Sequence, residues 1–128
     1  MDPAQYYKPN LLGGSVEYDV DLSKENCGCV AAFYLVGAPG KNRSGQYWNT
    51  DGYYYCDANQ VGGNYCPEYD IMEANMFVSQ TTVHSCNAPD GNGFYNQCNR
   101  GGTCIQNTKD KLAYNDYGPG SQYKINTQ

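Results

Sequence analysis

The sequence has few charged residues and no long hydrophobic run. Asp, Glu, Lys and Arg make up 16% of the 128 residues, and eight basic residues stand against thirteen acidic ones, for a formal net charge of -5. Without a basic excess, the phosphates of nucleic acid and anionic membrane surfaces are not expected partners. The sequence also has no apolar stretch of transmembrane length. A neutral partner or substrate is compatible with this composition.

Signals for amphipathic helices are also scarce, whereas glycine and tyrosine are abundant, with 15 and 14 copies. This composition indicates loops and strands, so the predicted fold class is all-β. The length is sufficient for one domain with a modest core. Alternating apolar and acidic residues predict a half-buried strand over 16–21, and the apolar run 29–37 predicts a strand buried on both faces. A last strand is predicted over 121–127.

The chain contains seven cysteines, which is many for its length. Such a count favours disulfides, an oxidising compartment and therefore a secreted protein. The number is odd, and residues 1–7 lack the apolar core and cleavage pattern of a signal peptide. The sequence thus predicts an extracellular protein without showing how it would be exported.

Three carboxylates lie within six residues of the segment 67–75, at Glu68, Asp70 and Glu73. In a regular strand Glu68 and Asp70 would share one face and Glu73 would point to the other. A β-bulge at Ile71-Met72 would turn Glu73 back, because two residues would then oppose one on the neighbouring strand. All three acids are therefore predicted to share one surface.

Crowded carboxylates suit glycoside hydrolysis with retention of configuration. That reaction needs two carboxyl groups about 5–5.5 Å apart, one ionised as nucleophile and one protonated as general acid. Glu68 and Glu73 would supply this pair, and Asp70 could share a proton or hydrogen bond with Glu68. The alternative interpretation is a solvated acidic edge strand that deters aggregation.

The acidic segment belongs to a longer series of ordered landmarks. They are Leu11-Leu12-Gly13, Val20-Asp21-Leu22-Ser23, Cys27-Gly28, Ala32-Phe33-Tyr34, Cys56-Asp57, Glu68-x-Asp70-x-x-Glu73-Ala74-Asn75 and His84-x-Cys86. This series resembles glycoside hydrolase family 7, the cellobiohydrolases and endoglucanases that cut β-1,4-glucan with retention. The resemblance extends along nearly the whole chain.

The resemblance implies a role for each acid. Glu68 would be the nucleophile, Asp70 its partner and Glu73 the acid/base. Substrate-binding positions would be filled by His84, Asp57 and Tyr34. The implied substrate is cellulose, and the implied reaction needs no organic cofactor and no metal.

The resemblance also implies an architecture and a disulfide pattern. The fold would be an antiparallel β-sandwich of the concanavalin-like jelly-roll type, and residues 1–128 would form the central fragment of one catalytic domain. The implied disulfides join Cys56 to Cys66 and Cys86 to Cys98. The family partners of Cys27 and Cys104 would lie beyond this chain, and a bridge from Cys27 or Cys29 to Cys104 stays open.

Several alternatives stay open at this stage. His84 and Cys86 have a spacing that metal ligation could use, although paired Cys-x-x-Cys spacing is missing. Asn42-Arg43-Ser44 is a glycosylation sequon of undetermined occupancy, and Trp48 could stack on a sugar or simply pack. A half sandwich has open edges, so it would pair with the missing remainder of the domain, with other chains or with copies of itself. A catalytically silent structural subunit of an extracellular assembly and a glucan-binding module are the alternatives to an enzyme.

Overall fold

The structure is a computed structural model that describes residues 7–38, 44 and 55–108. The predictions for the Asn42 sequon, for Trp48 and for a strand over 121–127 lie outside these residues. Within them, no helix is long and apolar enough to span a membrane.

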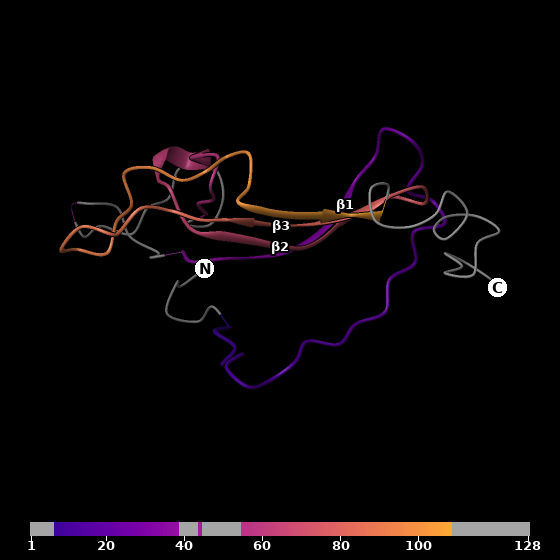
Figure 1. Ribbon diagram of the computed structural model, residues 1–128, viewed down its shortest axis with the longest axis horizontal. Helices are drawn as coiled ribbons and strands as arrows, with labels where there is room; N and C mark the ends of the chain where they lie inside the picture. The colour runs from indigo at the N-terminus through magenta and orange to yellow at the C-terminus, as the bar shows by residue number, and fades with distance from the viewer. Residues whose placement is uncertain (1–6, 39–43, 45–54, 109–128) are drawn as a thin grey trace.

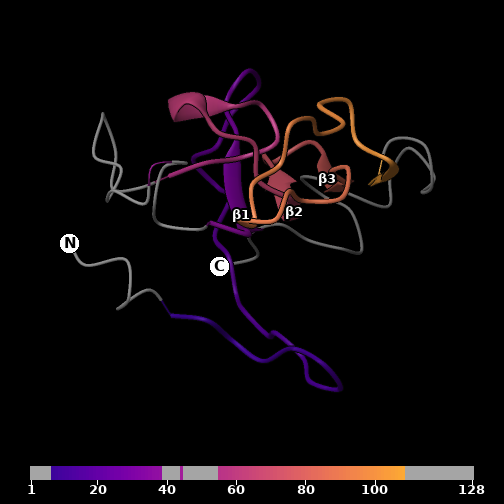
Figure 2. The ribbon, with the colours of Figure 1, turned by 90° about the vertical axis from the view of Figure 1, so that its left-hand side faces the viewer.

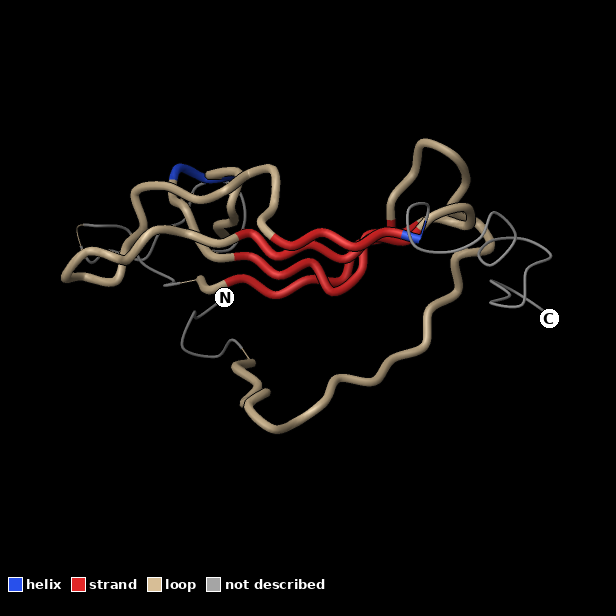
Figure 3. The backbone as a smooth tube through the Cα atoms, in the orientation of Figure 1, coloured by secondary structure: helices blue, strands red, loops and turns tan. Residues whose placement is uncertain are grey.

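The described residues form one four-stranded antiparallel sheet with the strand order β1-β2-β3-β4 (Figures 1 and 3). The strands are β1 (Ala31–Val36), β2 (Glu68–Ala74), β3 (Ser79–His84) and β4 (Cys104–Asn107). A short 3₁₀ helix, η2 (Val61–Gly63), lies in the connection between β1 and β2. The prediction of an all-β chain is therefore confirmed.

The predicted β-bulge is present in the middle of β2. Asp70 pairs with Thr82 of β3 and Glu73 pairs with Gln80, so Ile71 and Met72 together oppose the single residue Thr81. The pairing of β2 with β1 shifts at the same place. The bulge prediction is confirmed at the residues named for it.

One face of the sheet carries the small core. Leu22, Met72 and Ala74 are buried against one another, and Ala31 and Phe33 pack on them. Met72 pairs with Phe33 and Ala74 pairs with Ala31, which places these side chains on the same face. Figure 2 shows the segment before β1 running along one side of the sheet. Leu22 of this segment is part of the core.

The predicted strand over 16–21 is wrong. The segment is extended and exposed, and among the described residues it pairs with no strand. One of its apolar side chains contacts the sheet, because the ring of Tyr18 meets that of Phe33 at 4.9 Å between centroids, while Val16 and Val20 are 41% and 46% exposed. The alternating pattern therefore lies in a segment that contacts the sheet through Tyr18 without joining it.

The burial of β1 also differs from its prediction, and β2 ends in a tight turn. β1 alternates between half-buried and exposed residues, so it is not buried on both faces, because the described residues form a single sheet. β2, which contains Glu73, ends at Ala74. Asn75 ends it by accepting hydrogen bonds from the N–H groups of Phe77 and Val78 at 2.9 and 3.1 Å, which closes a tight turn into β3.

Candidate active site

The bulge places the three acids on one face of the sheet. β3 contains no irregularity, so its residues Gln80, Thr82 and His84 alternate regularly onto a single face. These three residues pair in order with Glu73, Asp70 and Glu68. Because directly paired residues project to the same side of a sheet, the acids face the same way. They lie opposite the core residues Met72 and Ala74.

Glu68 is held by a backbone donor from a distant loop. The N–H of Ala58 donates a hydrogen bond of 3.1 Å to Oε2 of Glu68. Burial raises the pKa of Glu68 above its ordinary value, and the charges of Asp70 and Asp57 raise it further. The Ala58 hydrogen bond and the nearby charge of His84 act in the opposite direction. The carboxyl group is therefore tuned by four close neighbours.

His84 joins the acids from the neighbouring strand. Its Nε2 lies 2.9 Å from Oδ2 of Asp70, and its Nδ1 lies 2.9 Å from the backbone oxygen of Asn99. Burial alone would lower the pKa of His84, but the hydrogen bonds to Asn99 and Asp70, with the charges of Asp70 and Glu68, raise it overall. Asp70 and His84 are both buried, so they form an enclosed ion pair beside Glu68.

Glu73 lies at the other end of the same face. Its Oε2 accepts a hydrogen bond of 3.4 Å from the side-chain nitrogen of Gln80, which also donates to the hydroxyl of Thr82 at 3.1 Å. Thr82 pairs with Asp70, so this chain of contacts runs along β3 between Glu73 and the Asp70 position. Glu73 is only partly buried, which leaves its carboxyl group reachable from solvent.

Two predicted substrate-binding residues lie beside the acids. Tyr34 pairs with Asp70 in the sheet, is 37% exposed, and meets the ring of Tyr55 edge-on at 6.3 Å. Burial and hydrogen bonds to Tyr34 and Asp57 raise the pKa of Tyr55. The Asp57 carboxylate is buried and accepts hydrogen bonds from the backbone of its own loop. The structure thus brings both predicted residues next to the acidic face.

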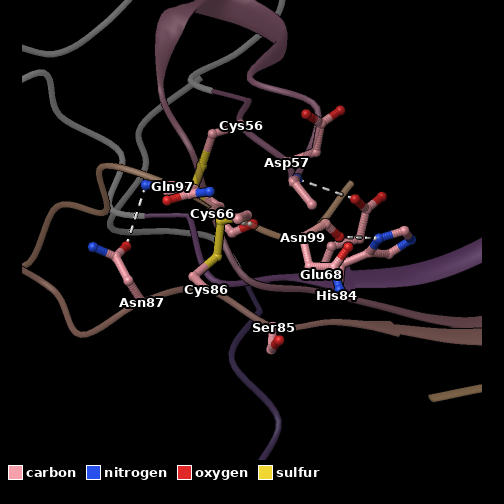
Figure 4. The surroundings of a disulfide bond; sticks show 12 residues. Cys56, Asp57, Cys66, Glu68, His84, Ser85, Cys86, Asn87, Gln97 and Asn99 are labelled. Carbon is pink, nitrogen blue, oxygen red and sulfur yellow. Dashed lines mark hydrogen bonds between the residues drawn. A yellow bond between two sulfur atoms is a disulfide. The ribbon is translucent and has the colours of Figure 1, made fainter. Parts of the chain in front are cut away.

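Two disulfides hold the loops at this end of the sheet (Figure 4). Cys56 is bonded to Cys66 and Cys86 to Cys98, the two pairs that the family resemblance implies. Figure 4 also shows Glu68 between the Asp57 loop and His84. The other three cysteines are free and exposed, so the open alternative of a bridge to Cys104 is not realised. They are Cys27, Cys29 and Cys104.

The structure also bears on metal binding. Cys86 is bonded to Cys98, which excludes the alternative of metal ligation by a His84 and Cys86 pair. Among the described residues, Glu68, Asp70 and His84 have ligand atoms within 4.8 Å of one another, close enough to share a cation. The Nε2 atom of His84 is already engaged with Asp70, so this group is described more simply as a hydrogen-bonded network.

Sequence reasoning missed the groups that support the acids. Ala58 and Asn99 act through their backbones, so their side chains carry no signal. Gln80 could have been found, because it lies four residues before His84 and a regular strand places both on one face. The supporting contacts come from three separate parts of the chain.

The chain is similar to fungal endoglucanases. It is 33% identical over 151 residues to endoglucanase 1 of Humicola insolens, which covers 96% of this chain and 36% of the relative. It is 31% identical over 153 residues to endoglucanase type C of Fusarium oxysporum, with 96% and 34% covered. No family model matches the sequence.

Solved structures give the same result. The structure superimposes on that of an endoglucanase I solved with cellobiose, with a TM-score of 0.63 and 29% identity, covering 84% of this chain and 33% of that one. The native endocellulase EGI of Humicola insolens gives a TM-score of 0.58 and 31% identity. These enzymes are β-sandwiches, so the predicted fold class is confirmed. The chain spans about a third of the length of the relatives it matches.

Proposed function

This chain is homologous to part of the family 7 glycoside hydrolases, and we propose that it carries the catalytic strand of a retaining β-1,4-glucanase. The observation that carries the proposal is the bulge in β2. It is the feature that turns Glu73 onto the face of Glu68 and Asp70. Without it, a spacing of five residues would put the two glutamates on opposite faces.

The proposed reaction has two displacement steps. In the first, an oxygen of Glu68 attacks the anomeric carbon while Glu73 gives its proton to the leaving oxygen, and a glycosyl-enzyme ester forms. In the second, Glu73 takes a proton from water, the water oxygen attacks the anomeric carbon, and the ester bond to Glu68 breaks. Two inversions at the same carbon restore the original configuration. No metal or organic cofactor enters either step.

The contacts around Glu68 suit a nucleophile. The Ala58 N–H reaches Oε2, so the carboxylate is oriented by a fixed backbone donor. Burial raises the pKa of Glu68, while the His84 charge counters that effect and helps to keep the group ionised. Asp70 is fixed in turn by His84. Glu73 is half-buried and has one weak contact to Gln80, so its carboxyl group stays accessible, as an acid/base residue requires.

The substrate we propose is a β-1,4-glucan such as cellulose. Relatives named endoglucanases and a related structure solved with cellobiose support this choice. Tyr34, with a ring 37% exposed next to Asp70, is placed to contact a sugar. Cellulose is an extracellular polymer, so this function also agrees with secretion, as do the disulfides.

Residues 1–128 would be the central part of one catalytic domain. On the face opposite the acids, Tyr69 and Val83 are 44% and 39% exposed. Beside them lies a hollow of 520 Å³ that is also lined by Leu11 and Leu35. An apolar surface of this kind is what the second sheet of a β-sandwich covers. We therefore propose that the remaining part of the domain packs here.

The test compares Glu68→Gln with the wild type in the whole protein that contains residues 1–128, using a soluble β-1,4-glucan and an aryl β-cellobioside. Loss of the nucleophile should lower kcat by at least about a thousandfold. The matched control is Glu17→Gln, which removes an exposed carboxylate from the segment that contacts the opposite face of the sheet through Tyr18, and it should leave kcat unchanged. The product anomer that forms first, identified by NMR, should be β.

Two results would overturn the proposal. The first is a Glu68→Gln variant as active as the wild type, and the second is a first-formed α anomer, which would indicate inversion. A wild type that assembles without any turnover would instead support the structural subunit.

A further inference from the structure

We infer that Asp57 is a positioning residue for Glu68, acting through the backbone N–H of Ala58, and that it does not bind the sugar directly. The inference rests on the proposed role of Glu68 as nucleophile. It differs from what the family resemblance implies for Asp57, which is a place among the substrate contacts.

The Asp57 carboxylate is occupied by its own loop. Its Oδ1 accepts hydrogen bonds from the N–H groups of Asn59 at 2.9 Å and Val61 at 3.0 Å. The residue is only 5% exposed. Two short bonds to the backbone fix the turn that leads into η2. Tyr55 contributes a further hydrogen bond to the same side chain.

The backbone of Asp57 is held at the same time. Its carbonyl oxygen accepts hydrogen bonds from the N–H groups of Gln60 at 3.4 Å and Cys66 at 2.9 Å. The disulfide from Cys56 to Cys66 ties down the same point, since these cysteines flank the loop and have Cα atoms 5.5 Å apart. Asp57 is therefore fixed through its side chain, its carbonyl and its neighbour.

The next residue, Ala58, connects the fixed Asp57 backbone to Glu68, the proposed nucleophile. Ala58 is fully buried, and its N–H donates to Oε2 of Glu68 at 3.1 Å. A peptide N–H can point at a fixed atom only if the peptide plane before it is fixed, and that plane includes the carbonyl of Asp57. The loop also ends at Cys66, two residues before Glu68. The hydrogen bonds of Asp57 thus set the direction of the donor.

Two substitutions separate the two roles. Asp57→Asn keeps an oxygen that can accept the same two N–H groups but removes the charge. Asp57→Ala removes both. The charged groups facing Glu68 are Asp57, Asp70 and His84, so both variants change its surroundings equally in charge. Only Asp57→Ala also releases the Ala58 donor.

The chain offers a matched control in Asp90. Its Oδ1 accepts hydrogen bonds from the N–H groups of Asn92 at 2.9 Å and Phe94 at 3.0 Å, the same spacing along the chain as in the Asp57 loop. Asp90→Ala therefore removes the same kind of turn bond from a different loop, and Asp90 is not among the groups that shift the Glu68 pKa. A general loss of loop order would affect both variants alike.

The experiment measures the Glu68 pKa by ¹³C NMR of the carboxyl carbons, together with kcat and KM on a soluble β-1,4-glucan. The chain has only four glutamates, at 17, 25, 68 and 73, so the Glu68 signal is assigned by its loss in Glu68→Gln. Asp57→Ala should have a higher Glu68 pKa than Asp57→Asn. Its kcat should be about tenfold lower than that of Asp57→Asn, with KM within about twofold. Asp90→Ala should match the wild type.

Equal Glu68 pKa values in the two Asp57 variants, or a KM that rises severalfold in Asp57→Asn, would overturn the inference. If Asp57→Ala does not fold, Asp57→Asn decides through KM. A residue that does not bind the sugar leaves KM unchanged, while the loss of its charge alone lowers the Glu68 pKa. If the wild type does not cut glucan, the proposed function fails. The difference in Glu68 pKa between the two Asp57 variants still tests whether Asp57 positions Glu68.

Discussion

The Nε2 atom of His84 lies 2.9 Å from Oδ2 of Asp70, and both side chains are buried. The other ring nitrogen faces the backbone oxygen of Asn99, which can only accept. An imidazole with an acceptor at each nitrogen is best satisfied when both nitrogens carry a proton. The geometry therefore explains why these contacts raise the pKa of His84 despite its burial.

The first prediction concerns stability and pH. A folded-state pKa above the ordinary value of 6.5 means that His84 binds its proton more tightly in the folded chain. Its contribution is complete below pH 6.5 and is lost as the pH rises through the folded pKa. The free energy of unfolding, measured by urea titration from about pH 5.5 to about 8.5, should fall over the upper part of this range.

The chain contains a single histidine, so its ring-proton NMR signal gives the pKa directly. His84→Asn is the control, and its unfolding free energy should not follow the wild-type decline. A His84 pKa at or below 6.5 in the folded protein would contradict this prediction.

The second prediction uses the bulge in β2. Deleting Ile71 removes the extra residue and reduces the spacing from Glu68 to Glu73 from five residues to four, so a regular strand would still place both on one face. Deleting Thr81 from β3, which has no extra residue, should instead turn Gln80 to the wrong face. The free energy of unfolding should fall by less than about 1 kcal/mol in the first case and more than about 3 kcal/mol in the second. Similar losses in both variants would argue against the observed register.

β2 shows what a sequence pattern can predict and what it cannot. The strand and its bulge could be predicted because the apolar and acidic residues of 67–75 fit only one face assignment once a residue is added. The same alternation over 16–21 gave a wrong prediction, since pairing depends on a partner strand that local sequence does not contain. Tyr18 of this segment does contact Phe33, but alternation does not show whether the backbone is paired.

In the candidate site, too, some groups could be predicted from the sequence and others could not. The acids and His84 could be predicted because their chemistry lies in the side chains. The backbone groups of Ala58 and Asn99 could not, because any residue offers the same N–H and C=O. The sequence also could not show that the Asp57 carboxylate accepts hydrogen bonds from its own loop. That turn forms only when residues 57–66 fold back on β2.

The third prediction tests whether the segment that contains Leu22 covers the core face of the sheet. Leu22 is 2% exposed and packs on Met72 and Ala74, although it lies in a segment without regular structure. Leu22→Ala should lower the free energy of unfolding by about 2–4 kcal/mol, because it leaves a cavity that the sheet cannot fill. The control is Leu12→Ala, at a position 96% exposed, which should change it by less than about 0.5 kcal/mol. Equal effects would show that the segment does not cover the sheet in solution.

The fourth prediction separates the two disulfides, which close loops of similar length, with sequence separations of 10 and 12. Replacing either pair by serine should therefore cost a similar free energy of unfolding, about 2–3 kcal/mol. Only the loop of Cys56 and Cys66 contains the donor to Glu68. Its removal should raise the Glu68 pKa, because the Ala58 hydrogen bond lowers that pKa in the intact protein. Removal of the pair Cys86 and Cys98 should change it less. The same rise in both double variants would mean that the disulfides act on Glu68 only through overall stability.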